Sequence, residues 1–355
     1  MESMLRTYRL FLPIAALYSL ASAALAAAPH SLRSPWDGKP VTPTGKAYVC
    51  PVLPHIPADL TTDGFYRLDD PTHSIVDPVR QAAYNASSGP VKREGMDIVA
   101  AADAFRTTGS LQAAECVRSH ILALAQGNSI AGKMSSNQAY YVQGWIAGAI
   151  AIDYLKVREA APLNAEQTRL VGDWLHSIGA QTEHYYDGKR DHGDKGNNHL
   201  YWAGVELAAI GIAANRRDDL DWGLGTYETG VKQIRPDGTL PLEMARGSKA
   251  LHYHLYALAP LVMLAEFGEA NGMDLYAHAN GAIHRLVKVS VGGLADPTLF
   301  EKATGVKQEV PRTPSGDQIG WAPPYVRRFP DATISQYIAN ARTLSIFYLG
   351  GLPPE

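Results

Sequence analysis

The sequence predicts an all-α protein with a single large domain, and three observations support this prediction. Apolar residues recur at helical spacing over most of the chain. The connections carry glycine, asparagine or proline stop signals, and no change of composition divides the chain in two. A length of 355 residues suits one large domain, and a hydrophobic content of 46% can supply a substantial core.

Two segments precede the helices. A basic start with Arg6 and Arg9, an apolar stretch from Leu10 to Leu20 and a run of small residues predict a secretory signal peptide over residues 1–26. An N-terminal membrane anchor is the alternative, although the apolar stretch is short for a membrane span. Residues 27–76 predict an irregular arm. We therefore expect a periplasmic or secreted protein.

Residues 77–355 form the predicted helical domain. Some of its segments, such as Trp145 to Ile152, are nearly apolar on all sides, which indicates helices buried within a helical assembly. Residues 304–330 contain five prolines and predict a long ordered loop. The expected helices span 77–86, 94–107, 110–126, 138–158, 164–184, 198–214, 217–233, 245–270, 272–287 and a final segment near 331–347.

Composition excludes several classes of protein. With 32 Lys and Arg against 35 Asp and Glu, the net charge of −3 argues against a nucleic-acid binder with a broad basic field. Two cysteines are too few for a disulfide-dense scaffold or a four-cysteine zinc site. In an exported protein, Cys50 and Cys116 are expected to form one disulfide, with two buried thiols as the alternative.

A polar, glycine-containing loop runs directly into an apolar helix near residue 198. We expect Asn198 to be the N-cap of this helix and His199 to lie in its first turn. The positive end of the helix dipole there favours a neutral imidazole and attracts anions. The plainer alternative is an ordinary asparagine cap followed by a histidine with satisfied hydrogen bonds.

A second cluster follows 47 residues later. On a helix, Arg246 and Tyr253 are two turns apart and share a face, with Tyr256 as a neighbour. A guanidinium beside a phenol lowers the pKa of the phenol and makes it available for acid–base work. The alternative is a Glu243–Arg246 pair with Tyr253 in the core. His252 and His254 point to different helix faces, which argues against a shared metal.

The two clusters together resemble the alginate lyases of polysaccharide lyase family 5. The strings that carry the resemblance are Asn197-Asn198-His199-Leu200-Tyr201-Trp202, Leu242-Glu243-Met244-x-Arg246 and Leu251-His252-Tyr253, and a weaker likeness extends from Cys50 to Phe329. The resemblance implies an incomplete (α/α) toroid of helical hairpins with a deep cleft, and a lid loop over the cleft that corresponds to residues 65–69 of the arm. It also implies a reaction without metal or other cofactor, and a disulfide between Cys50 and Cys116.

The resemblance further implies roles for individual residues. Asn198 and Arg246 would bind the uronate carboxylate, and His199 would assist them or act as a base. Tyr253 would take the C5 proton and protonate O4 in a β-elimination on poly-β-D-mannuronate (alginate), and on polyglucuronate as a second substrate. The expected partner is thus an anionic polyuronate, bound by a monomer. Further candidates for substrate binding are Tyr66, Arg67, Tyr141, Trp202, His252, Tyr256 and Arg342.

Two rival functions stay open at the level of sequence. A glycoside hydrolase on a similar helical toroid would need two carboxylates about 5–10 Å apart. Asp194, Glu206 and Glu243 are the candidates for that pair. A non-catalytic periplasmic polysaccharide-binding protein would keep the cleft without turnover.

Overall fold

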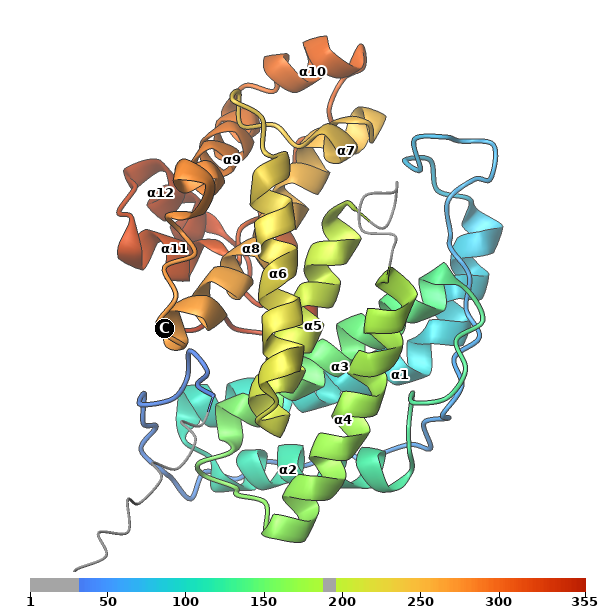
Figure 1. The fold of residues 1–355 in the computed structure, drawn as a ribbon, viewed down its shortest axis with the longest axis vertical. Helices are drawn as coiled ribbons and strands as arrows, with labels where there is room; N and C mark the ends of the chain where they lie inside the picture. The colour runs from blue at the N-terminus through green and yellow to red at the C-terminus, as the bar shows by residue number, and fades with distance from the viewer. Residues whose placement is uncertain (1–31, 188–195) are drawn as a thin grey trace, which may run out of the picture. The chain divides into compact units, whose positions relative to one another are not determined.

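The computed structural model describes residues 32–187 and 196–355, which belong to one compact unit. The predicted signal peptide and Asp194 lie outside the described residues. Secondary structure within the described part of the chain consists of helices and a few isolated β-bridges (Figure 1). Among these helices, none combines the length and apolar character that a membrane span requires.

The helices follow one another with short connections over most of the chain. Residues 32–76 hold no helix and run along the outside of the helical unit (Figure 1). The helices are α1 (Pro78–Thr108), α2 (Leu111–Gln126), α3 (Asn137–Val157), α4 (Ala165–Tyr186), α5 (Asn198–Ala214), α6 (Arg217–Gln233), α7 (Pro241–Met244), α8 (Ala250–Ala270), α9 (His278–Ala295), α10 (Thr298–Thr304), α11 (Ala322–Arg328) and α12 (Ala332–Asn340).

The predicted bounds are accurate for α2 to α6 and need correction elsewhere. The two helices expected over 77–86 and 94–107 are one helix, because the chain stays helical through Pro90 and buries Tyr84, Val91 and Ile98 in one core. Regular α9 starts only after Gly281, since residues 279–281 have left-handed backbone angles. The expected loop 304–330 contains α11, and the last long helix, α12, ends at Asn340.

The centre of the unit is α5, which packs against α3, α4, α6 and α8 (Figure 1). Almost every residue of α5 from Leu200 to Ile212 is buried, as expected for a helix that is apolar on all sides. Glycines allow α5 and α6 to approach closely: a Cβ at Gly204 would lie 1.8 Å from Thr226 Oγ1. Packing along the whole of α5 therefore fixes the position of its N-terminal end, where the predicted site begins.

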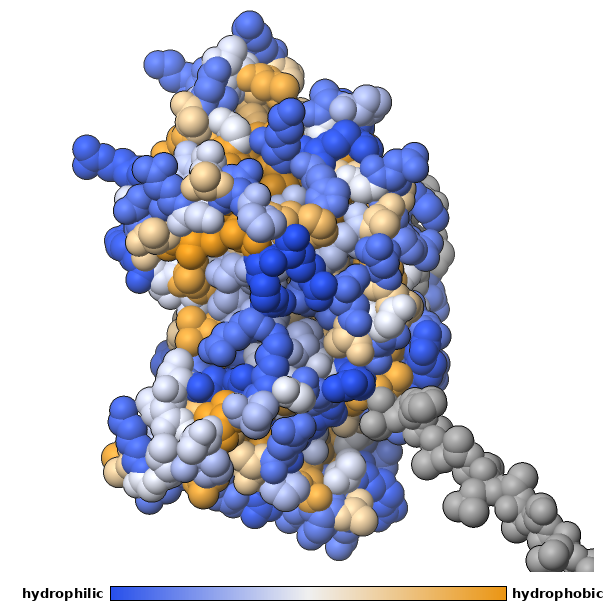
Figure 2. Space-filling view, turned by 90° about the vertical axis from the view of Figure 1, so that its left-hand side faces the viewer, coloured by the Kyte–Doolittle hydropathy of each residue, from blue (hydrophilic) through white to orange (hydrophobic). Residues whose placement is uncertain are grey.

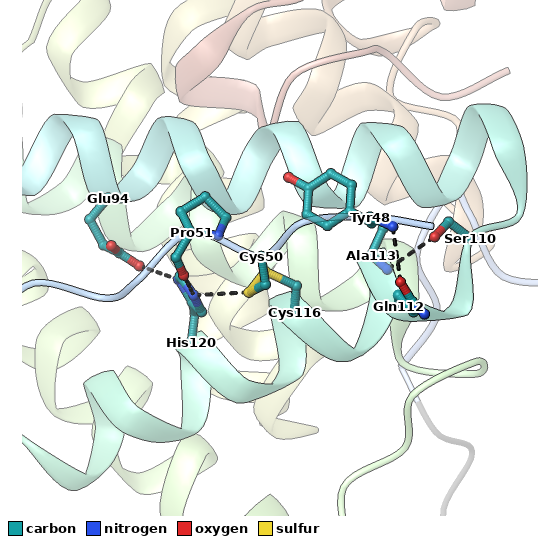
Figure 3. The surroundings of a disulfide bond; sticks show 9 residues. All are labelled: Tyr48, Cys50, Pro51, Glu94, Ser110, Gln112, Ala113, Cys116 and His120. Carbon is teal, nitrogen blue, oxygen red and sulfur yellow. Dashed lines mark hydrogen bonds and ion pairs between the residues drawn. A yellow bond between two sulfur atoms is a disulfide. The ribbon is translucent and has the colours of Figure 1, made fainter. Parts of the chain in front are cut away.

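A disulfide joins the N-terminal arm to α2 (Figure 3). Cys50 and Cys116 are bonded, with their Cα atoms 5.5 Å apart, which confirms the predicted disulfide and excludes the two-thiol alternative. His120 lies beside it, with Nε2 3.3 Å from Cys50 Sγ and Nδ1 2.7 Å from Glu94 Oε1. Closing a loop of 66 residues contributes about 4 kcal/mol in the chain-entropy treatment, so the arm is firmly attached.

The surface carries both apolar and charged side chains. Figure 2 shows the side that α11 and α12 occupy at the left of Figure 1, where hydrophilic side chains predominate and apolar ones form small patches between them. On α11, Arg328 is paired with Glu266 at 2.8 Å and with Glu269 at 2.9 Å. This arginine is therefore neutralised by its neighbours.

Candidate active site

The largest described cavity lies where the N-terminal arm meets the starts of α5 and α8, and has a volume of about 850 Å³. Aromatic and cationic side chains dominate its lining. Asp317 is the single carboxylate among the described lining residues. The polar and aromatic lining residues include Tyr66, Arg67, His73, Arg80, Tyr84, Lys92, Tyr141, Trp145, Asn197, His199, Arg246, His252, Tyr253, Tyr256 and Tyr348.

The start of α5 differs from the prediction by one residue. Asn197 is the N-cap, since its Oδ1 accepts the backbone N–H of His199 at 3.0 Å. Asn198 is the first helical residue and is 0% exposed. Its backbone N–H and its Nδ2 donate to the two oxygens of Glu243, at 2.8 and 2.9 Å. Its amide therefore links α5 to α7 and does not line the cavity.

Glu243 is buried beneath this contact. Burial raises the pKa of Glu243 to about 7, against the opposing effect of the hydrogen bond from the Asn198 backbone and the charge of Arg246. Because both of its oxygens bind Asn198, the alternative of a simple Glu243–Arg246 surface pair does not describe this site. Glu243 instead fixes the amide that precedes His199.

His199 borders the cavity and stacks on Tyr141, with ring centroids 3.9 Å apart and planes inclined by 11°. Burial, reinforced by the charge of Arg246, lowers the pKa of His199 to about 3. The imidazole is therefore neutral at ordinary pH, in the direction that the sequence predicted. The dominant cause is burial, whereas the helix dipole was the cause expected from the sequence.

Arg246 and Tyr253 meet as predicted, but not on one continuous helix. Arg246 precedes the 3₁₀ turn η2 (Gly247–Lys249), and α8 begins at Ala250. The guanidinium carbon of Arg246 lies 3.6 Å from the centroid of the Tyr253 ring. The Tyr253 hydroxyl is 2.7 Å from the hydroxyl of Tyr66, which comes from the N-terminal arm.

The predicted pKa direction for Tyr253 is wrong. Burial raises the pKa of the phenol well above its usual value. Arg246 acts in the opposite direction, as the sequence indicated, but its effect is smaller than that of burial. The free phenol is therefore protonated, and a phenolate at this position would be a strong base.

The arm contributes a loop over this part of the cavity. Two N–H groups of Arg246 donate to backbone carbonyls of the loop, to Thr72 at 2.9 Å and to His73 at 2.7 Å. Asp70 organises the loop by accepting the backbone N–H groups of Thr72, Ser74 and Ile75. Burial alone would raise the pKa of Asp70, but these hydrogen bonds outweigh burial and hold it well below its usual value.

The remaining candidates from the sequence divide into two groups. Tyr66, Arg67, Tyr141, His252 and Tyr256 line the cavity. Trp202 does not line it, because its ring is buried against Tyr256, with centroids 4.9 Å apart. Arg342 is exposed and does not line it either.

His254 and the described carboxylates of the alternative functions lie outside the cavity lining. His254 is fully buried and structural: its Nε2 accepts the N–H of Leu240 at 2.9 Å, and its Nδ1 lies 2.7 Å from the Ala250 carbonyl oxygen. Glu206 and Glu243 are buried and do not line the cavity. In the described residues, the one group spaced to hold a metal is Cys50, Cys116 and His120, at the disulfide.

Sequence reasoning missed a further set of polar residues that line the cavity. Lys92 Nζ donates to Tyr84 Oη at 2.6 Å, and burial lowers the pKa of Lys92 to about 8. Burial also raises the pKa of Asp317 to about 6. The expected gap between residues 86 and 94 hid the fact that Tyr84 and Lys92 belong to one helix.

Comparisons with known proteins identify the family of the chain. The family model described as alginate lyase matches residues 63–300. A polysaccharide lyase of Stenotrophomonas maltophilia (strain K279a) is 36% identical over 80% of this chain and 83% of its own. An alginate lyase of Cobetia marina is 31% identical over 70% of this chain and 67% of its own.

A solved structure shows the same architecture. Alginate lyase A1-III from Sphingomonas species A1 superposes with a TM-score of 0.71 at 25% identity, covering 86% of each chain. This match confirms the predicted all-α fold of the (α/α) toroid type. From its motifs, its matched residues and its fold, the chain belongs to the alginate lyases of polysaccharide lyase family 5 and is a polysaccharide lyase.

Proposed function

We propose that this lyase cleaves 1,4-linked polyuronate by β-elimination and that poly-β-D-mannuronate is its main substrate. The observation that carries the proposal is the position of the Tyr253 hydroxyl, in the cavity, beside the Arg246 guanidinium and within hydrogen-bond distance of Tyr66. A neutral imidazole, His199, borders the same cavity. An imidazole, a guanidinium and a phenol around one space suit the chemistry of a uronic acid.

The reaction needs negative charge to be stabilised. The C5 proton is weakly acidic because its removal adds charge next to a carboxylate. Donors aimed at the carboxylate oxygens stabilise that charge, and each such donor typically contributes about 3–4 kcal/mol to the transition state. We assign this task to Arg246 and His199. The buried Asn198 takes a positioning role through Glu243, in place of the direct carboxylate contact that the sequence suggested.

Tyr253 would move the proton. On mannuronate, H5 and O4 lie on the same side of the ring, so one phenol between them can serve as base and then as acid. The C5–H bond breaks, a C4–C5 double bond forms, and the C4–O4 bond breaks as O4 receives a proton. The Arg246 charge favours the phenolate that this requires, against the effect of burial.

A glycoside hydrolase is disfavoured as the alternative. Its two carboxylates would have to face each other across the cavity. Asp317 is the single carboxylate in the described lining, and Glu206 and Glu243 are buried elsewhere. The third candidate, Asp194, lies outside the described residues. We also propose that the protein works in the periplasm or outside the cell, from the signal-like N-terminus and the disulfide.

One assay tests the proposed function. Purified protein is incubated separately with polymannuronate, polyguluronate and polyglucuronate, and both ultraviolet absorbance and reducing ends are followed. We expect absorbance from the conjugated unsaturated uronate to rise fastest with polymannuronate. Reducing ends without absorbance would indicate hydrolysis. Faster cleavage of polyguluronate or polyglucuronate would overturn the substrate assignment.

A further inference from the structure

A second, much smaller pocket lies directly behind His199. It offers about 10 Å³ to the centre of a water molecule, which is the size of a site for one water. His199, Trp202 and Glu206 all line it, and their spacing of three and then four residues places them on one face of α5. His199 also borders the main cavity, so its ring separates the two spaces.

Three residues of α5 that line this pocket each carry a polar atom without a protein partner. His199 Nδ1, Trp202 Nε1 and Glu206 Oε2 are all buried without a hydrogen bond. A buried polar atom left unsatisfied costs about 1–3 kcal/mol, so three such atoms at one small pocket indicate a shared partner. One water offers two hydrogens and two lone pairs, which is enough hydrogen-bonding capacity for all three atoms.

The carboxyl group of Glu206 sits in a niche that the neighbouring helices provide. A Cβ at Gly144 of α3 would lie 2.5 Å from Glu206 Oε2, so only glycine leaves room for it there. Glu206 is 1% exposed, and its Oε1 accepts the Thr182 hydroxyl at 3.1 Å. Burial, with a contribution from the charge of Asp219, raises the pKa of Glu206 to about 8 against the effect of Thr182. Glu206 is therefore predominantly a neutral acid at pH 7, and because Oε1 accepts the Thr182 hydroxyl we place its hydrogen on Oε2.

Counting hydrogens then fixes the state of His199. The indole N–H of Trp202 can only donate, and the acid hydrogen of Glu206 also donates, so together they fill both lone pairs of the water. The water must therefore donate to His199 Nδ1, which has to carry a lone pair. We propose that Glu206, as a neutral acid acting through one buried water, holds His199 in the tautomer with hydrogen on Nε2. This inference rests on the proposed role of His199.

The tautomer decides what His199 can do in the cavity. With hydrogen on Nε2, the ring donates a hydrogen bond to the uronate carboxylate and has no free lone pair there to act as a base. In this tautomer His199 can neutralise the substrate carboxylate during the syn elimination on mannuronate. It cannot act as the base that the anti elimination on guluronate would need. Glu206 is thus a positioning residue that also biases substrate choice.

Nitrogen NMR of the histidine-labelled, full-length protein tests the proposal, with the His199 signals assigned from a His199→Asn variant. We expect the wild type to show a protonated Nε2 and an unprotonated Nδ1 at neutral pH. A protonated Nδ1 would overturn the proposal. This measurement needs no substrate, so it stays informative even if polymannuronate proves not to be the substrate.

Two variants of Glu206 sharpen the test. Glu206→Gln keeps a neutral donor and should retain both the tautomer and near-wild-type turnover. Glu206→Met removes the donor and should lower kcat by roughly 10- to 100-fold, with KM within about twofold, as when the partner that orients a functional histidine is removed. A Glu206→Gln variant as impaired as Glu206→Met would show that an ionised carboxylate is needed and would overturn the proposal.

A matched control separates this effect from general damage. Glu94 is a buried carboxyl beside a different histidine, His120, and it lies away from the cavity. Glu94→Gln should leave the His199 signals and kcat unchanged. If Glu206→Met does not fold, the wild-type spectrum and Glu206→Gln still decide the question.

Discussion

The two walls of the cavity are built in different ways. One, the α5–α8 wall, consists of His199, Arg246 and Tyr253, and its properties come from burial: the pKa of His199 falls and that of Tyr253 rises. The other, the loop wall of residues 64–73, is half-exposed, and its shape comes from hydrogen bonds to Asp70. Burial of the first wall depends on the packing of several helices. The conformation of the loop depends on one carboxylate, so one substitution can change it.

This difference suggests that one wall serves the chemical step and the other serves substrate binding. The two walls touch at only a few polar contacts, between Tyr66 and Tyr253 and between Arg246 and the loop carbonyls. A substrate carboxylate that approaches Arg246 would compete with those carbonyls for the N–H donors of the guanidinium. We therefore expect substitutions in the α5–α8 wall to change kcat, and substitutions in the loop wall to change mainly KM.

The largest effect is expected from Tyr253→Phe, because it removes the proposed proton carrier and leaves the ring in place. We expect kcat to fall by at least about 10³-fold, within the range of general acid–base catalysis. Substrate binding, measured by calorimetry with mannuronate oligomers, should change little. Tyr337→Phe on α12, away from the cavity, is the matched control. Retained turnover in Tyr253→Phe would remove Tyr253 from the mechanism.

The next largest effect is expected from Arg246→Leu. Loss of the guanidinium removes the carboxylate donor and the charge that favours phenolate, and kcat/KM should fall by about 10²–10³. Arg246→Lys should recover only part of this loss, since an ammonium cannot reproduce the planar fork. Arg217→Leu, an exposed arginine paired with Asp221 on α6, serves as control. A loss below tenfold in Arg246→Leu would contradict the assigned role.

Much of this wall could be predicted from sequence, and the reason is local. The Asn197 to Trp202 string runs from a polar loop into an apolar helix, so it specifies both a helix start and an imidazole near it. Long apolar segments gave the bounds of α3 and α5 for the same reason. The meeting of Arg246 with Tyr253 also followed from spacing, although a turn replaces the expected helix there.

Other features depend on contacts that spacing does not encode. The pKa of Tyr253 depends on how deeply the whole chain buries it, so a single neighbour gave the wrong direction. The amide of Asn198 turns toward Glu243, 45 residues away, and not toward the cavity. The gap expected between residues 86 and 94 does not occur, because the helix continues through Pro90 and residues on both sides of it join one core.

The loop wall should respond to Asp70→Ala. This change removes the acceptor for three backbone N–H groups, so the carbonyls of Thr72 and His73 would lose their fixed position over Arg246. We expect KM to rise on the order of tenfold, since charge-assisted hydrogen bonds each contribute about 1.5–3 kcal/mol, while kcat changes less. Steady-state kinetics on polymannuronate measure this. A fall in kcat as large as that of Arg246→Leu would contradict the division between the walls.

The last prediction concerns stability and pH, with little change in turnover, and it tests whether burial governs the side of α5 behind the cavity. The pKa of Glu206 in the folded protein is about 8, above its ordinary value of 4.5. Its contribution to stability is therefore complete below pH 4.5 and is lost as the pH rises toward 8. Each pH unit in that window removes up to about 1.4 kcal/mol from the wild type, and Glu206→Gln is spared this loss.

The comparison isolates Glu206 because other groups are shared. The lowered pKa values of His199, His252 and His254, about 3, 4 and 4, make stability fall as the pH drops below about 6.5, equally in both proteins. Denaturant unfolding at pH 5, 6, 7, 8 and 9 should thus show Glu206→Gln gaining on the wild type up to about pH 8 and levelling off above it. A constant difference would mean that Glu206 is ionised in the folded protein, and burial would then not control this side of the α5–α8 wall.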